Sequence, residues 1–190
     1  MKELVILGGP NGAGKTTAAQ DLLPKTLGIR EFVNADEIAR GLSPFNPEAT
    51  AIAAGRLMIE RIRDLAAAGE NFAFETTCAG RGHVALLRQC RSAGYRVTLV
   101  FLWLPSPQAA LARVARRVRE GGHAIPDEVV VRRYHAGLRN LRHLYLPEVD
   151  GAFIFDNWDR GRVVIADVVR GLPVRVRDAE RWGLIEEATR

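Results

Sequence analysis

A glycine-rich segment near the N-terminus, "GGPNGAGKT" at residues 8–16, carries the most specific chemistry in the sequence. It has the spacing Gly-x4-Gly-Lys-Thr, and it lies between an apolar run at 3–9 and a helical pattern. In this arrangement backbone N–H groups and a helix N-terminus converge on phosphate oxygens, while the lysine reaches the β and γ phosphates and the hydroxyl binds Mg²⁺. The segment therefore predicts a P-loop that binds ATP and Mg²⁺. The predicted nucleotide contacts are Gly9, Pro10, Asn11, Gly12, Ala13, Gly14, Lys15, Thr16 and Thr17, with Lys15 also catalytic and Thr16 on the metal.

Two carboxylates follow strand-like segments and are candidates for the side of the site that receives the phosphate. Asp36 ends the predicted strand "EFVNAD" (31–36), where it could orient a hydroxyl group and accept its proton, or cap the short helix that follows. Glu75, with Thr76 and Thr77, ends the predicted strand "NFAFETT" (71–77). That group suits a hydroxylated acceptor or a water molecule bound to Mg²⁺, or it only caps the strand. Since ligands gather at the carboxyl edge of parallel sheets, both carboxylates are predicted to lie at the site.

An arginine-rich segment, "RVARRVREGGH", places Arg113, Arg116 and Arg117 on neighbouring helical turns ahead of two glycines. Arginines carried over the phosphates by a closing segment would stabilise the charge of the transferring phosphoryl group. The segment predicts a lid, with these three arginines as catalytic candidates. Arg132 and Arg133, on the next predicted helix, are further candidates. A solvated helix surface is the alternative interpretation for each arginine.

Strand-like and helical segments alternate along the chain, which predicts a parallel sheet covered on both faces. A long helix is expected at 48–68, with an apolar stripe of Ile52, Leu57, Ile59, Ile62 and Leu65. Two final strands, 151–157 and 161–167, are expected to form a hairpin around residues 158–161. The prediction is an α/β, three-layer, kinase-like P-loop NTPase fold with a mainly parallel central sheet and a helical lid that bears arginines. One kinase domain is expected at 1–175, with its lid at about 107–143 and a charged tail at 176–190.

Composition restricts the class of protein. The 190 residues carry a formal charge of +5, but the basic residues are spread opposite acidic ones, so nucleic acid is not the expected partner. No apolar run approaches the roughly 20 residues that a membrane helix needs, and the N-terminus lacks the pattern of a signal peptide. The four histidines show no metal-ligand spacing, and neither cysteine lies in a motif. We therefore expect a cytoplasmic protein without a membrane partner.

Several stretches together resemble the zeta-toxin family of P-loop kinases. They are "GGPNGAGKTT", "VNADEIARGLSPFNPE", "AGRLM", "FAFETT", "RVARRVREGGHAIPDEVVVRRYHAGLRNL" and "FDN", and they cover most of residues 4–157. The resemblance implies a kinase that transfers the γ-phosphate of ATP to the 3′-hydroxyl of the amino sugar in UDP-N-acetylglucosamine. It also implies Asp36 as the base, Glu75 and Thr76 at the acceptor, an arginine of the 113–117 group over the phosphates, and a small antitoxin as a possible partner. His123 stands where the family has a second lid arginine.

Three alternatives remain open from the sequence. The first is a kinase of another small hydroxyl compound, and the second is a kinase of a nucleic-acid 5′-hydroxyl, which also needs a P-loop, a base and an arginine lid. The third is a nucleotide-dependent switch with no acceptor. Phosphate transfer that depends on Asp36 would separate the kinases from the switch.

Overall fold

The computed structural model describes residues 1–122, 124–158 and 161–189. Within them one seven-stranded sheet has the order β2-β3-β1-β4-β5-β6-β7. The first five strands along the chain run parallel, whereas β6 and β7 are added antiparallel at one edge. The strands are β1 (Lys2–Gly8), β2 (Glu31–Val33), β3 (Phe72–Thr76), β4 (Tyr95–Trp103), β5 (Gly151–Asp156), β6 (Val163–Val169) and β7 (Arg175–Val176). The predicted mainly parallel sheet is confirmed.

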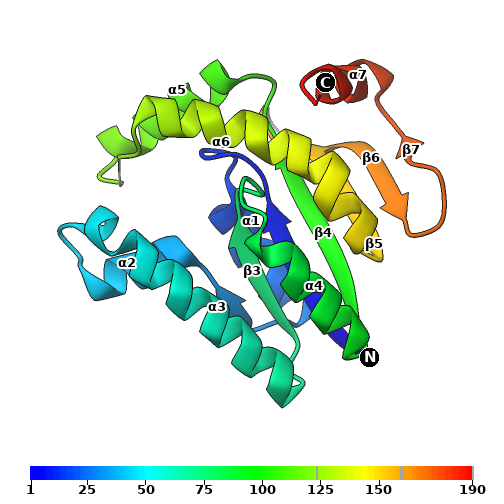
Figure 1. Ribbon diagram of the computed structural model, residues 1–190. Helices are drawn as coiled ribbons and strands as arrows, with labels where there is room; N and C mark the ends of the chain where they lie inside the picture. The colour runs from blue at the N-terminus through cyan, green and yellow to red at the C-terminus, as the bar shows by residue number, and fades with distance from the viewer. Residues whose placement is uncertain (123, 159–160, 190) are drawn as a thin grey trace.

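Helices cover the sheet as the right-handed crossover rule requires. In Figure 1, α3 and α4 lie in front of the sheet, α1 lies behind it, and α6 crosses above the upper ends of the central strands. The central strands are apolar on both faces, and Ile6, Phe74 and Leu99 have no exposed surface. The helices are α1 (Lys15–Leu22), α2 (Ala35–Leu42), α3 (Ala51–Ala68), α4 (Gly82–Ser92), α5 (Pro107–Arg119), α6 (Asp127–Asn140) and α7 (Ala179–Glu187).

Short helical turns extend several of these elements. A π-helical turn, Leu23–Leu27, follows α1, and a second one, Leu141–Tyr145, continues α6. The 3₁₀ turns are Pro47–Thr50, which precedes α3, and Leu146–Glu148, which leads to β5. The α6 extension matters for the site, since it carries Tyr145 onto the loop that follows β3.

Two predicted elements differ from the structure. Strand β2 ends at Val33 rather than residue 36, because the Asn34 side chain accepts the Asp36 N–H at 2.8 Å and starts helix α2. Helix α3 starts at Ala51 and buries only part of the predicted stripe: Ile62 and Leu65 are buried, whereas Ile52 and Leu57 are exposed by 76% and 41%. Its buried face is Ala54, Met58, Ile62 and Leu65, which follows a spacing of three to four residues more closely.

The hairpin predicted near the C-terminus is confirmed, with β5 and β6 antiparallel and a register shift at Ile154/Phe155. Its predicted turn includes residues 159 and 160, and the lid position of His123 likewise lies outside the described residues. The predicted tail, 176–190, contains helix α7 and only the last residue of β7. Within the described residues no helix is both long and apolar enough to cross a membrane.

Candidate nucleotide and acceptor site

The P-loop follows β1 and is held from both sides. Gly12 has a φ of +79°, and a Cβ there would lie 2.9 Å from the Cβ of Arg113 on α5, so only glycine fits this approach. Arg113 Nη1 lies 3.5 Å from the Gly12 carbonyl, and its Nη2 donates to the Trp158 carbonyl at 2.6 Å. Asn157 Nδ2 donates to the Ala13 carbonyl at 2.6 Å. The middle of α5 and the segment after β5 therefore both contact the P-loop backbone and restrain it.

The P-loop lysine and threonine meet Glu75 of β3. Parallel pairing of β1 and β3 places Leu7 opposite Glu75. Thr16 Oγ1 donates to Glu75 Oε2 at 2.7 Å, and Lys15 Nζ lies 3.5 Å from Glu75 Oε1 while it donates to the Pro10 carbonyl at 3.0 Å. Lys15 and Glu75 side chains are only 6% and 12% exposed. The largely buried Glu75 carboxylate thus compensates the charge of Lys15 through one oxygen and accepts the Thr16 hydroxyl hydrogen bond through the other.

Asn34 joins this cluster from the other side. Its Nδ2 donates to Glu75 Oε2 at 3.0 Å while its Oδ1 accepts the Asp36 N–H. One buried amide therefore both orients Glu75 and starts the helix that carries Asp36. Sequence reasoning missed Asn34 as a site residue, although an asparagine three residues before Glu37 in a helical segment is a recognisable N-cap signal.

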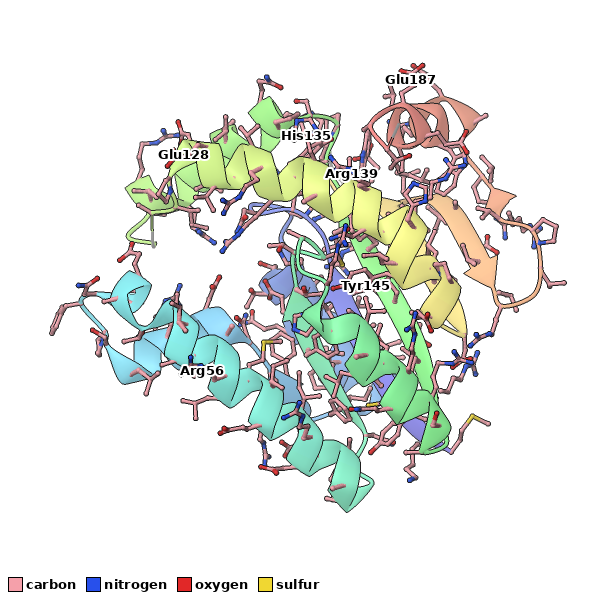
Figure 2. The ribbon with its side chains drawn as sticks, viewed as in Figure 1. Arg56, Glu128, His135, Arg139, Tyr145 and Glu187 are labelled. Carbon is pink, nitrogen blue, oxygen red and sulfur yellow. The ribbon has the colours of Figure 1, made fainter. Side chains whose placement is uncertain are left out.

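A pocket of about 710 Å³ extends from the P-loop across the ends of β2 and β3 to α6. Figure 2 shows side-chain nitrogen atoms from α6 entering the space between α6 and the α2–α3 pair. Polar and charged groups line its floor and roof, and Met58 and Ile59 of α3 form an apolar wall. The polar lining residues are Asn11, Lys15, Asn34, Asp36, Glu75, Thr76, Thr77, His83, Arg132 and Arg133.

Asp36 lies at the mouth of this pocket, in the first turn of α2 rather than at a strand end. Its side chain also lines a second pocket, of about 230 Å³, between α2 and the α5–α6 turn. The residue is exposed, and among the described residues none gives its carboxylate a hydrogen bond or an ion pair. Asn34 takes the capping role that was the alternative for Asp36, so the Asp36 carboxylate is available to a ligand.

The predicted lid arginines lie in three different places. Arg113 packs against Trp158, with its Cζ 5.3 Å from the ring centroid, and binds the P-loop backbone as described. Arg116 is 74% exposed and pairs with Glu120 at 2.8 Å. Arg117 lines the smaller pocket, whereas Arg132 and Arg133 of α6 line the larger one. Roles for Arg113, Arg116 and Arg117 at the phosphates stay predictions, and in this arrangement α6 supplies the arginines closest to the acceptor side.

Buried groups around the pocket set its electrostatic character. Asn11 is 5% exposed, and its Oδ1 has no hydrogen-bond partner among the described residues. His83 stacks on Phe74, with ring centroids 5.1 Å apart, and burial lowers its pKa from the ordinary value of 6.5, which favours the neutral imidazole. Burial raises the pKa of Cys78 to about 12, against the opposing effects of Lys15 and a hydrogen bond from Gly9. The Cys78 thiol therefore stays protonated at neutral pH, which removes it as a nucleophile.

Comparison with known proteins places the chain in a family. A family model described as an AAA domain matches residues 4–141. The chain belongs to this AAA-domain family. A Haemophilus influenzae protein whose function is uncharacterised is 30% identical over 129 residues, which span 66% of this chain and 88% of that protein.

Solved structures with the same fold include a chain of the PezAT chromosomal toxin–antitoxin system of Streptococcus pneumoniae. It has 18% identity and a TM-score of 0.67, with 99% of this chain and 86% of that chain covered. A structure of AvrRxo1-ORF1 with AvrRxo1-ORF2 and ATP has 21% identity and a TM-score of 0.75, and this chain, covered in full, spans 64% of that one. The fold is therefore that of zeta-toxin-like P-loop kinases, as the sequence motifs indicated.

Proposed function

We propose that the protein is an ATP-dependent phosphotransferase that phosphorylates a hydroxyl group of a small acceptor. One observation carries this proposal: a single pocket is lined by the P-loop Lys15, by Asp36 and by two arginines of α6. A switch needs the nucleotide site alone, whereas a kinase needs an acceptor cavity with a base and cationic groups beside the γ-phosphoryl group. By the resemblance to zeta toxins, the proposed acceptor is the 3′-hydroxyl of the amino sugar in UDP-N-acetylglucosamine.

In the proposed reaction the acceptor hydroxyl attacks the γ-phosphorus, a new P–O bond forms, and the bond between the γ-phosphorus and its bridging oxygen breaks to release ADP. Asp36 accepts the hydroxyl proton, because it lines the pocket and its carboxylate has no protein partner among the described residues. Lys15 stabilises the charge on the phosphates. Arg133, which lines both pockets, is placed to stabilise the transferring group.

Thr16 and Glu75 fit the proposed requirement for Mg²⁺. Their oxygen atoms lie 2.7 Å apart beside the P-loop lysine, and a hydroxyl and a carboxylate are ligands of the type that Mg²⁺ binds directly or through water. Bound with the nucleotide, the ion would neutralise phosphate charge. In this proposal Glu75 helps to hold the metal ion, and Thr76 and Thr77 bind the acceptor.

The proposal is tested by incubating the purified chain with Mg-ATP and one acceptor at a time, followed by mass spectrometry. The panel contains UDP-N-acetylglucosamine, free sugars, nucleosides and an RNA with a 5′-hydroxyl. We expect one product heavier by a single phosphate group, with UDP-N-acetylglucosamine as the acceptor. A product from another member would refute the proposed acceptor and retain the kinase, whereas ATP binding with no product from any member would favour the switch.

We also propose that the chain has a protein partner. The fold is shared with a chain of a toxin–antitoxin system, and by that likeness we propose that a small protein restrains this chain in the cell. Co-expression with the products of neighbouring genes, followed by co-purification, would test this. The partner proposal fails if none of those proteins co-purifies or lowers phosphotransferase activity.

A further inference from the structure

The 76–80 loop lies along the larger pocket: it begins at Thr76, the last residue of β3, and its residues 77–80 belong to no helix or strand. Thr76, Thr77, Ala79 and Gly80 line the pocket. Cys78, in the middle, has a φ of +57°, a left-handed conformation that costs free energy for any residue but glycine. The Thr76 hydroxyl accepts the Cys78 N–H at 3.0 Å. Local bonds of this kind do not by themselves hold a strained loop, so the restraint must come from a packed element.

The end of helix α6 supplies that restraint through three consecutive carbonyl groups. Asn140 Nδ2 donates to the carbonyls of Cys78 and Ala79, each at 2.9 Å. Tyr145, in the π-helical turn, donates its hydroxyl to the Gly80 carbonyl at 3.0 Å. Asn140 is 7% exposed and Tyr145 is fully buried. Figure 2 shows Tyr145 at the end of α6 that faces α4.

The backbone of α6 also contacts the loop directly. A Cβ at Gly137 would lie 2.6 Å from the Thr77 carbonyl oxygen and 3.9 Å from the Ala79 nitrogen. No side chain fits at that distance without a shift of the helix or the loop. Gly137 therefore permits the close approach, and Asn140, one turn later, makes the hydrogen bonds that exploit it.

We infer that Asn140 and Tyr145 are positioning residues for the acceptor: they fasten the 76–80 loop to α6 and so fix Thr76 and Thr77. This rests on the proposed function, since it concerns the same pocket. The same helix carries Arg132, Arg133 and Ala136 to the pocket lining. The arginines of α6 and the hydroxyl groups proposed to bind the acceptor are therefore joined through one helix.

The kinetic test compares Asn140→Asp and Tyr145→Phe with Tyr134→Phe. The aspartate keeps the shape but loses the N–H donor, and Tyr145→Phe removes one buried hydroxyl. Tyr134 is a matched control, because its buried hydroxyl, on the same helix, donates to the Leu104 carbonyl at 2.8 Å and does not touch the loop. We expect Asn140→Asp to raise the acceptor KM by about tenfold or more, and Tyr145→Phe by less, with the KM for ATP within about twofold of wild type. Tyr134→Phe is expected to leave both constants near the wild-type values.

A parallel rise in both KM values, or an equal effect of Tyr134→Phe, would overturn the inference and assign these residues to general stability. Hydrogen–deuterium exchange of the full chain tests the fastening without any acceptor. Peptides covering 76–83 should exchange faster in Asn140→Asp and Tyr145→Phe, whereas P-loop peptides should keep their protection by Mg-ATP. Wild-type exchange at 76–83 in both variants would refute the fastening whichever acceptor the protein uses. If no acceptor in the panel is phosphorylated while exchange accelerates as expected, the proposed function fails and the fastening stands.

Discussion

Individual side chains define the site through shared partners. Glu75 accepts hydrogen bonds from Thr16 and Asn34 and lies beside Lys15. A single carboxylate therefore connects the proposed metal ligand, the P-loop lysine and the residue that starts α2. The types of these residues were readable from the sequence, and so was the spacing of the P-loop. Their mutual contacts were not, because they join segments that are 41 and 59 residues apart.

A matched pair of arginines tests which helix serves the phosphates. Arg133 lines both pockets, whereas Arg116 is mostly exposed and paired with Glu120. We expect Arg133→Met to lower kcat by about 10³-fold and Arg116→Met to change it little, because an arginine that lines the pocket can stabilise the transferring phosphoryl group, whereas Arg116 is held by Glu120 at the surface. Steady-state kinetics of both variants measure this. A large loss in Arg116→Met with normal activity in Arg133→Met would return the lid role to α5.

His83 makes stability depend on pH. Burial lowers its pKa below 6.5, so the unfolded chain takes up this proton at a higher pH than the folded chain. Its contribution to the free energy of unfolding is therefore complete above about pH 6.5 and is lost as the pH falls through the lower pKa of the folded state. Urea denaturation between pH 7.5 and 5 should show a steeper loss of stability for wild type than for His83→Gln. Equal slopes would mean that folding leaves the pKa of His83 unchanged.

The predicted bounds of helices and strands agreed best with the structure where a single apolar pattern dominated the segment. The strands predicted at 71–77 and 151–157 were found as β3 (Phe72–Thr76) and β5 (Gly151–Asp156), within a residue of the predicted bounds. β2 was predicted too long, because Asn34 stops the strand with a side-chain hydrogen bond. The α3 stripe was right at Ile62 and Leu65 but wrong at Ile52 and Leu57, which are apolar but face solvent while the small Ala54 faces the core. Side-chain size alone does not identify the buried face of a helix that also forms one wall of a pocket.

Two truncations test which face of α3 is buried. Ile62 is fully buried and Leu57 is 41% exposed. Ile62→Ala should lower the free energy of unfolding by about 2–5 kcal/mol, because it leaves a cavity in a packed core. Leu57→Ala should change it by roughly 0.5 kcal/mol or less, as for an exposed site. Chemical denaturation of both variants provides the comparison, and equal losses would contradict the observed orientation of the helix.

At the scale of the whole molecule, the C-terminal helix α7 is connected to the nucleotide site. Arg181 Nε donates to Asp156 Oδ2 at 2.7 Å, and Asp156 Oδ1 accepts the Trp158 N–H at 2.8 Å. Asn157, between them, donates to the Ala13 carbonyl of the P-loop. The segment predicted as a charged tail therefore supports the loop beside the phosphates. This support was not predicted from the sequence, because it depends on a side-chain contact between Arg181 and Asp156, which are 25 residues apart.

Removing Arg181 should weaken both stability and nucleotide binding. Asp156 is 5% exposed, and Arg181→Ala takes away the cation that compensates it. We expect a lower urea midpoint and a raised Kd for Mg-ATP, whereas Arg142→Ala, which removes the more exposed pair with Glu186 on the same helix, should alter neither by much. Calorimetric titration with a non-hydrolysable ATP analogue measures the binding. An unchanged Kd in Arg181→Ala would limit α7 to a structural role.

One product assay most directly tests the proposed role of Asp36 as the base. Wild type, Asp36→Asn and Glu37→Gln are incubated with Mg-ATP and UDP-N-acetylglucosamine, and the phosphorylated product is quantified by mass spectrometry. Glu37 is the matched control, since it is the neighbouring carboxylate and pairs with Arg40 at 2.9 Å on the exposed side of α2. We expect wild type and Glu37→Gln to form the product and Asp36→Asn to form it about 10²- to 10⁴-fold more slowly, with unchanged ATP binding. Product formation by Asp36→Asn at the wild-type rate would contradict the assignment of Asp36 as the base.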